Sequence, residues 1–252
     1  MRRKSDPEAS MPLLKHLKEL RKVLMVVAYA VAAGALGGWL LSDPVFAYLA
    51  RPITHLGQGF VTLTPMEAVL VKLKMSLVIG CVIASPIIFW QLWSFILPAL
   101  KQNETKLIYI AAPCSLFLFL CGISFCFFYV LPVGVKFLLY VGKDAVETTT
   151  LLSKASFLSF VLTFLLTFGL VFQIPIVLLM LIRGGIVTPQ TLAKKRRWAF
   201  FIIVLLAAIV SPTPDLMTQG LMVVPMYLLY EVSIWLGYLT ARRRKKRLAE
   251  QE

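Results

Sequence analysis

Two acidic residues, Glu19 and Glu104, lie in segments that are otherwise basic. Glu19 stands among the lysines and arginines of the N-terminal segment, and Glu104 stands between Lys101 and Lys106. A carboxylate in such a setting can accept a forked pair of hydrogen bonds from a guanidinium. It can equally form a salt bridge with a Lys or Arg of its own chain. The residue types therefore indicate two candidate binding sites for a cationic guest, and internal salt bridges are the open alternative.

Other combinations of reactive residues are missing from the sequence. It contains no Ser-His-Asp set, phosphate-binding loop or zinc-ligand spacing, and its two histidines, His16 and His55, are expected on opposite sides of a membrane. The four cysteines lie in apolar segments and form no CxxC pair: Cys81, Cys114, Cys121 and Cys126. Cysteines in such segments are typically packing residues. The sequence therefore favours binding or transport over an enzyme, and no metal or cofactor is expected.

The composition indicates a membrane protein. Of the 252 residues, 59% are hydrophobic and 15% are charged, and the mean hydropathy is +0.83. A soluble domain has about 45–50% apolar and about 25% charged residues. We therefore expect an all-α integral membrane protein.

Six apolar segments are expected to cross the membrane. They are Val23–Leu41, Ala68–Leu97, Leu107–Leu131, Ala155–Ile182, Trp198–Val210 and Leu216–Leu239. The fifth has only 13 residues, which at about 1.5 Å per residue span roughly 20 Å of a hydrocarbon core of about 30 Å. The sixth is also expected to be short, because polar residues and Pro225 interrupt it. Short spans predict local thinning of the bilayer.

Charge predicts the orientation of these segments. Of the 26 Lys and Arg residues, 20 lie in the termini and in the loops on the same side as the termini. The positive-inside rule makes that side cytoplasmic. The net charge of +14 is thus a topology signal with lipid contact, and nucleic acid is excluded as a partner. We expect one domain over residues 1–252, with flexible basic cytoplasmic ends at 1–11 and 242–252.

Four motifs give the chain a recognisable pattern. They are His16-Leu-Lys-Glu-Leu-Arg21; Ser85-Pro86 with Gln91, Trp93, Phe95, Pro98, Leu100 and Glu104; Phe168-Gly169 with Phe172 and Pro175; and Pro214-Asp215 with Gln219, Pro225-Met226-Tyr227 and Glu231. Together they resemble the TatC family, the polytopic subunits of twin-arginine protein translocases. The resemblance covers about Leu13 to Leu239.

The resemblance implies a function. The chain would be a signal-peptide receptor and core component of a translocase that exports folded proteins with twin-arginine signal peptides, driven by the proton-motive force. It would lie in the bacterial cytoplasmic (inner) membrane with both termini in the cytoplasm. Its six helices would form a concave, glove-like bundle. Its partners would be single-span subunits of the TatA/TatB type in an oligomeric receptor complex.

The resemblance also implies roles for single residues. Glu19 and Glu104 would bind the two arginines of a signal peptide. Three residues would shape that site: Arg21, Phe95 and Leu100. Five others would belong to the outer cap, to partner docking or to transport: Pro52, Gln173, Asp215, Gln219 and Glu231.

Gln173 departs from the family, which commonly has Glu at this position in the fourth span. An amide does not titrate near neutral pH, but it donates and accepts hydrogen bonds. Either the position needs only polarity, or this protein differs in mechanism; an interhelical hydrogen bond is the plainest role.

Gln173 and Glu231 also keep a second interpretation open, a secondary transporter for a small solute, which would use polar groups at membrane depth.

Overall fold

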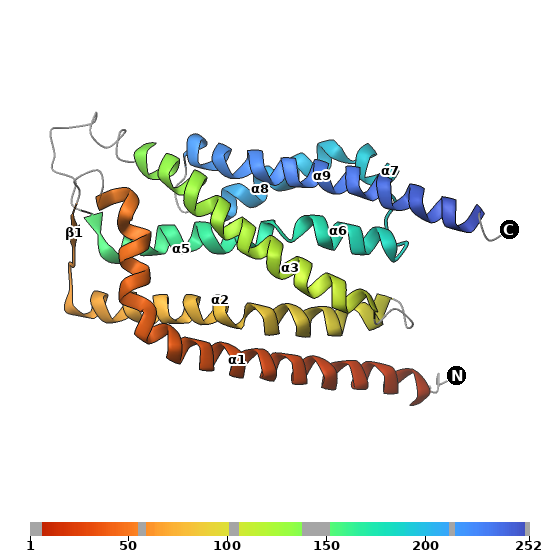
Figure 1. The fold of residues 1–252 in the computed structure, drawn as a ribbon, viewed down its shortest axis with the longest axis horizontal. Helices are drawn as coiled ribbons and strands as arrows, with labels where there is room; N and C mark the ends of the chain where they lie inside the picture. The colour runs from red at the N-terminus through yellow and green to blue at the C-terminus, as the bar shows by residue number, and fades with distance from the viewer. Residues whose placement is uncertain (1–6, 55–58, 101–105, 138–151, 212–214, 250–252) are drawn as a thin grey trace, which may run out of the picture. The chain divides into compact units, whose positions relative to one another are not determined.

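The structure is a computed structural model that describes residues 7–54, 59–100, 106–137, 152–211 and 215–249 (Figure 1). Side chains are described within these ranges except at 7–16, 52, 97–100, 106–108 and 243–249. Helices dominate, as the composition predicts. Helix extends into both terminal segments, from Pro7 and as far as Ala249, and the flexibility of these ends stays a prediction.

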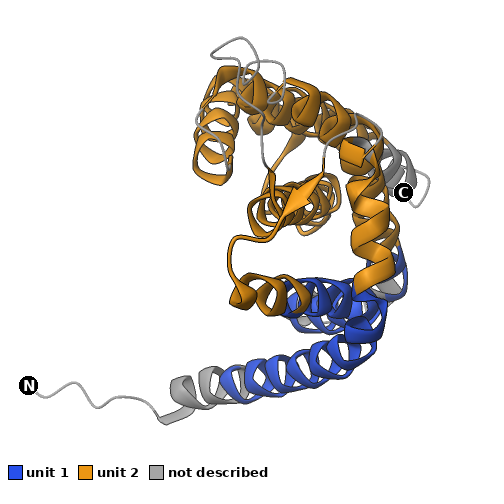
Figure 2. Cartoon of the chain, turned by 90° about the vertical axis from the view of Figure 1, so that its left-hand side faces the viewer, with its two compact units in different colours: residues 1–42, 73–113 blue, residues 43–72, 114–252 orange. Residues whose placement is uncertain are grey.

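The chain forms two compact units (Figure 2). Unit 1 comprises Met1–Ser42 and Leu73–Pro113, and unit 2 comprises Asp43–Lys72 and Cys114–Glu252. Three helices contribute residues to both units: α1 (Pro7–Thr54), α2 (Pro65–Leu100) and α3 (Lys106–Phe125). The expectation of a single domain over residues 1–252 stays a prediction.

Unit 1 is built on close contact between α1 (Pro7–Thr54) and α2 (Pro65–Leu100). A Cβ atom on Gly34 would lie 2.7 Å from the carbonyl oxygen of Gly80, and one on Gly38 would lie 2.5 Å from that of Ser76. The Ser76 hydroxyl donates to the carbonyl of Ala35 at 2.6 Å. Small residues let two helix backbones approach where no hydrophobic force drives association in lipid. The Gly- and Ala-rich first span therefore packs closely against α2.

Unit 2 contains a small sheet that the sequence reading did not include. Strand β1 (Phe60–Val61) pairs in parallel with β2 (Leu152–Ser153), with Phe60 opposite Leu152 and Val61 opposite Ser153. Phe46 of α1 packs against the ring of Phe60 at 5.6 Å between centroids. The segment between the first two apolar spans is thus partly helix, because α1 continues to Thr54, and partly strand.

The third and fourth spans are interrupted helices. The third begins in unit 1 and continues in unit 2 after Pro113, and the fourth belongs to unit 2. Helix α3 (Lys106–Phe125) passes into the π-helix η1 (Cys126–Val130), and residues 131–137 are again helical. The fourth span divides into α5 (Lys154–Val171) and α6 (Ile174–Arg183). Pro175 stands in the first turn of α6. Because proline has no backbone N–H, a carbonyl oxygen in the preceding turn receives no helical hydrogen bond from it. One predicted span is therefore two helices with Phe172 and Gln173 between them.

The C-terminal part of unit 2 contains α7 (Pro189–Lys194), α8 (Arg196–Val210) and α9 (Leu216–Ala249). Helix α9 packs against α6, α7 and α8. Helix α8 has 15 residues, about 22 Å at 1.5 Å per residue, which confirms a short fifth helix. The prediction of a short sixth helix is wrong, since α9 has 34 residues. It continues through Pro225, and its polar residues Gln219 and Glu231 find partners on α8.

Five helical stretches within the described ranges are long and apolar enough to cross a membrane: Leu17–Arg51, Pro65–Ile96, Tyr109–Phe137, Lys154–Arg183 and Leu216–Arg242. Helix α8 is shorter than any of these. The count of six spans, with α8 as the fifth, stays a prediction.

Candidate functional site

The N-terminal part of α1 carries the first candidate acid on an exposed surface. The side chains of Glu19 and Arg21 are both exposed. Arg21 also borders a shallow apolar hollow whose other walls are Leu17, Leu20, Leu24, Met25 and Ala28. Leu17 and Leu24 are 59% and 60% exposed. Exposed leucines therefore lie beside a carboxylate and a guanidinium on this part of α1.

The second candidate acid, Glu104, lies outside the described residues. The helices on either side of it are held together by Trp90 of α2 and Tyr109 of α3, whose rings meet edge to face with centroids 5.2 Å apart. Phe95 is partly buried, and Leu100 is the last residue of α2. Helix α2 ends two residues beyond Pro98. The meeting of Glu19 and Glu104 in one site thus remains a prediction.

Gln173 joins the break between α5 and α6 to a neighbouring helix. Its side-chain Nε2 donates to the carbonyl oxygen of Ser115 on α3 at 3.0 Å. Ser115 is fully buried. The interhelical hydrogen bond predicted for Gln173 from the sequence is therefore present, and the NH2 group of the side chain is its donor.

Asp215 and Gln219 bind groups at the start of α9. Asp215 is the residue before the helix, and its Oδ1 accepts from the backbone N–H of Thr218 at 2.7 Å, which is the geometry of an N-cap. One turn later, Gln219 Nε2 donates to the carbonyl oxygen of Val204 on α8 at 3.3 Å. Asp215 thus begins α9, and Gln219 ties α9 to the short helix. The side chain of Pro52, in α1, is not described.

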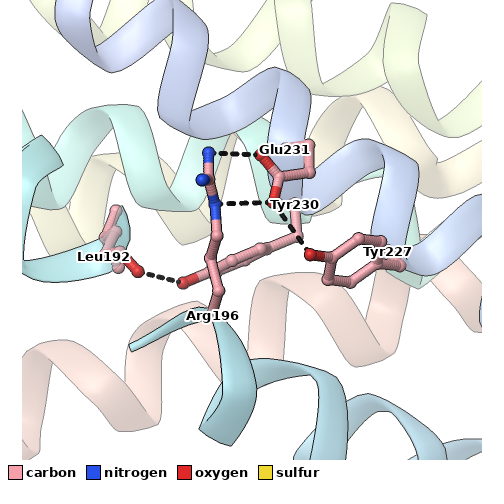
Figure 3. Close-up of polar contacts among 5 residues, drawn as sticks. All are labelled: Leu192, Arg196, Tyr227, Tyr230 and Glu231. Atoms are coloured by element: carbon pink, nitrogen blue, oxygen red, sulfur yellow. Dashed lines mark hydrogen bonds and ion pairs between the residues drawn. The ribbon is translucent and has the colours of Figure 1, made fainter. Parts of the chain in front are cut away.

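Glu231 is the centre of a polar cluster between α8 and α9 (Figure 3). Arg196 approaches it with two nitrogens: Nη2 donates to Oε2 at 2.8 Å, and Nε lies 2.8 Å from Oε1. The Tyr227 hydroxyl donates to Oε1 at 3.0 Å. Beside them, the Tyr230 hydroxyl donates to the carbonyl of Leu192 at 3.0 Å. The forked pair is the arrangement that makes Arg–carboxylate contacts specific.

Sequence reasoning missed Glu67, which is only 7% exposed. Its Oε1 accepts from the Ser153 hydroxyl at 2.6 Å and from the Ala155 N–H at 2.8 Å. Its Oε2 accepts from the Leu63 N–H at 2.7 Å. The carboxylate therefore fastens the start of α2 to the junction between β2 and α5.

A sequence signal for part of this network exists. Thr64-Pro-Met-Glu67 has the spacing of a capping box with Pro at the first helical position. Thr64 Oγ1 accepts from the Glu67 N–H at 3.3 Å. The pattern could have marked the start of α2 at Pro65. It could not have identified Ser153 and Ala155, because they lie 86 and 88 residues away.

These features define a polytopic helical membrane protein. Comparison with known proteins makes the class specific. Residues 15–225 match the family "Sec-independent protein translocase protein (TatC)". The chain belongs to the TatC family.

Individual relatives agree along nearly the whole length. The Sec-independent protein translocase protein TatC of Carboxydothermus hydrogenoformans is 38% identical over 227 residues, which cover 90% of this chain and 93% of that protein. The TatC protein of Aquifex aeolicus is 39% identical over 238 residues, which cover 94% and 98%. A crystal structure titled as the twin arginine translocase receptor TatC superposes with a TM-score of 0.80 at 39% identity, covering 90% of this chain and 99% of that chain.

Proposed function

We propose that this chain is the signal-peptide receptor and core subunit of a twin-arginine translocase in a bacterial cytoplasmic membrane. The observation that carries the proposal is the likeness to the solved twin arginine translocase receptor at 39% identity over 90% of the chain, with a TM-score of 0.80. The family match over residues 15–225 agrees with it. Both termini are cytoplasmic in this proposal, as the distribution of Lys and Arg predicts.

Glu19 and Glu104 grip the arginine pair of the signal peptide. Each carboxylate can accept two hydrogen bonds from a guanidinium, whereas a lysine ammonium is a point charge without that fork. Arg21, Phe95 and Leu100 line the same site. The exposed leucines beside Glu19 offer an apolar surface to the hydrophobic part of the peptide. This support comes from the exposure of Glu19, Arg21, Leu17 and Leu24.

Single-span partner subunits of the TatA/TatB type dock beside Asp215 and Gln219 in an oligomeric complex, with Pro52 in the outer cap and with Gln173 and Glu231 serving transport. The short α8 supports this, because a helix of about 22 Å leaves polar groups at its ends closer to the middle of a bilayer. Replacing Gln219 with Leu should weaken recovery of a partner subunit with the receptor after mild detergent extraction. Recovery equal to the parent would argue against docking at this place.

Binding of a labelled twin-arginine signal peptide to membranes tests the receptor function. Glu19→Gln and Glu104→Gln should each weaken binding about tenfold, and the double variant about a hundredfold, since a charge-assisted hydrogen bond is worth roughly 1.5–3 kcal/mol and about 1.4 kcal/mol is tenfold. Asp43→Asn is the matched control, because it removes one negative charge from an exposed acid paired with Lys72.

Two results would oppose the proposal. The first is a double Gln variant that binds as tightly as the parent, which would make the acids ordinary surface charges. The second is equal binding of a twin-lysine peptide, which would remove the reason for a forked carboxylate contact. Insertion of every variant in the membrane should be unchanged.

A further inference from the structure

One end of unit 2 gathers basic side chains from four helices. They are Arg183 of α6, Lys194 of α7, Lys195 between α7 and α8, Arg196 and Arg197 of α8, and Arg242 of α9. We call these six residues the basic end. All six are exposed. The helices are joined there by the hydrogen bond from Tyr230 to Leu192, by the ion pair of Arg196 with Glu231, and by the packing of Gly237 against Ile182 and Pro189. Figure 1 shows α7 beside α9.

Among the described residues of unit 2, few acids offset the positive charge of the basic end. Of the four acids of unit 2 that the structure describes, Asp43 and Glu67 belong to the region of the small sheet, and Asp215 starts α9. Glu231 is therefore the single described acid near the basic end, and it already forms an ion pair with Arg196. Lys194, Lys195 and Arg197 have no ion pair within the described part of the chain. Exposed like charges at this density favour an anion from outside the chain.

Apolar side chains begin at once beside these cations. Trp198 is 69% exposed, Phe201 59% and Ile202 51%. They lie in the first two turns of α8, directly after Arg197. A boundary between exposed cations and exposed aromatic and aliphatic groups matches the boundary between lipid headgroups and acyl chains, where Trp is enriched. A soluble anion would use the cations but would leave this apolar surface unexplained.

We infer that the basic end is a binding site for the headgroup phosphate of an anionic phospholipid. Lys194, Lys195 and Arg197 hold the phosphate, and Trp198 and Phe201 contact the start of the acyl chains. The site anchors the cytoplasmic end of the short helix α8 at headgroup level, while Arg196 remains bound to Glu231. The inference stands on unit 2 alone and does not depend on the proposed receptor function.

Spin-labelled lipids measure this site directly. The full-length protein is placed in phosphatidylcholine bilayers that contain a trace of spin-labelled phosphatidylglycerol or, separately, spin-labelled phosphatidylcholine. Electron paramagnetic resonance then gives the relative association of each lipid with the protein. A cation near an anionic surface is worth about 1 kcal/mol, which is about fivefold. Lys194→Gln with Lys195→Gln should therefore lower the preference for phosphatidylglycerol by roughly twentyfold, and adding Arg197→Gln should lower it further.

The matched control removes two lysines from the other end of unit 2, Lys136→Gln with Lys154→Gln. It should leave the preference nearly unchanged. An equal loss in control and test variants would reduce the effect to diffuse charge and overturn the site. A test variant that keeps the full preference for phosphatidylglycerol while its helix content matches the parent would also overturn it.

A competition arm separates the lipid from a free phosphate. Inorganic phosphate and soluble glycerophosphoglycerol are added to the parent protein at the concentration of the labelled headgroup. The lipid should stay bound, because neither competitor has acyl chains for Trp198 and Phe201. Displacement by either one would show a site for soluble anions and overturn the assignment to lipid.

Discussion

Glu67 and Glu231 are two carboxylates of unit 2 that the protein stabilises in different ways. Glu67 is 7% exposed and accepts hydrogen bonds from a hydroxyl and two backbone N–H groups, none of which carries a formal charge. Glu231, whose side chain is 30% exposed, is paired with the guanidinium of Arg196, itself 50% exposed. A buried carboxylate needs several donors aimed at it, whereas a carboxylate near solvent can rely on one cation.

The comparison also separates their sensitivity to salt and to substitution. The donors to Glu67 are held by backbone geometry at the starts of α2 and α5, so ions in solution reach them poorly. The pair between Arg196 and Glu231 is open to solvent and is screened. We therefore expect the hydrogen bonds of Glu67 to contribute more to the stability of the folded protein than the ion pair of Glu231 does.

The largest effect is expected from Glu67→Gln. The amide has a single acceptor oxygen, and its NH2 group would face one of the donors that the carboxylate accepted from, so a buried N–H or hydroxyl is left unsatisfied. The unfolding temperature of the purified protein should fall by several degrees, equally at low and high salt. Asp43→Asn is the control and should change it little, because Asp43 is exposed. A Gln variant as stable as its parent would show that the three bonds are replaceable.

Charge reversal at the second carboxylate should have a moderate effect. Arg196→Glu and Glu231→Arg should each destabilise the protein, and the double swap should recover part of the loss. We expect a coupling energy of about 1 kcal/mol from the double-mutant cycle, falling as salt is added. Chemical unfolding in a mild detergent measures it. If no coupling energy is measured at low salt, this ion pair contributes nothing to the free energy of unfolding.

The hydrogen bond from Gln173 to the Ser115 carbonyl involves no charged group and extends the comparison. Gln173→Leu removes the donor to the Ser115 carbonyl, at a cost of about 0.5–1 kcal/mol for a polar interhelical contact in a membrane protein. It should also impair export by the assembled translocase. Gln173→Glu should keep export, with the bond to Ser115 retained by a protonated carboxyl. Unimpaired export with Leu at this position would remove any need for polarity there.

The smallest effect is expected from Tyr227→Phe. It removes one hydrogen bond to Glu231 and leaves the forked pair with Arg196 intact. A cost of about 0.5 kcal/mol is expected, at the low end for a hydrogen bond, again from chemical unfolding. A cost above that of breaking the Arg196 pair would reverse the order of importance within the cluster.

Some local features could be predicted from the sequence because they depend on neighbouring residues. The short fifth helix follows from the 13 apolar residues between Arg197 and Ser211, and the close packing of α1 on α2 follows from small residues one turn apart. The prediction failed for the sixth helix. Gln219 and Glu231 looked like interruptions, but α9 continues past both because Val204 and Arg196 satisfy them.

The sequence by itself determined the class of the protein, its apolar segments, its expected orientation and its family motifs, since each depends on residue type and short spacing. Only the tertiary structure decided which polar groups meet. Glu67 finds Ser153 across 86 residues, and Glu231 finds Arg196 across 35. Such pairs depend on how helices and strands pack. A carboxylate accepts a hydrogen bond from any suitable donor, and its neighbours in the sequence do not determine which distant donor the fold brings near it.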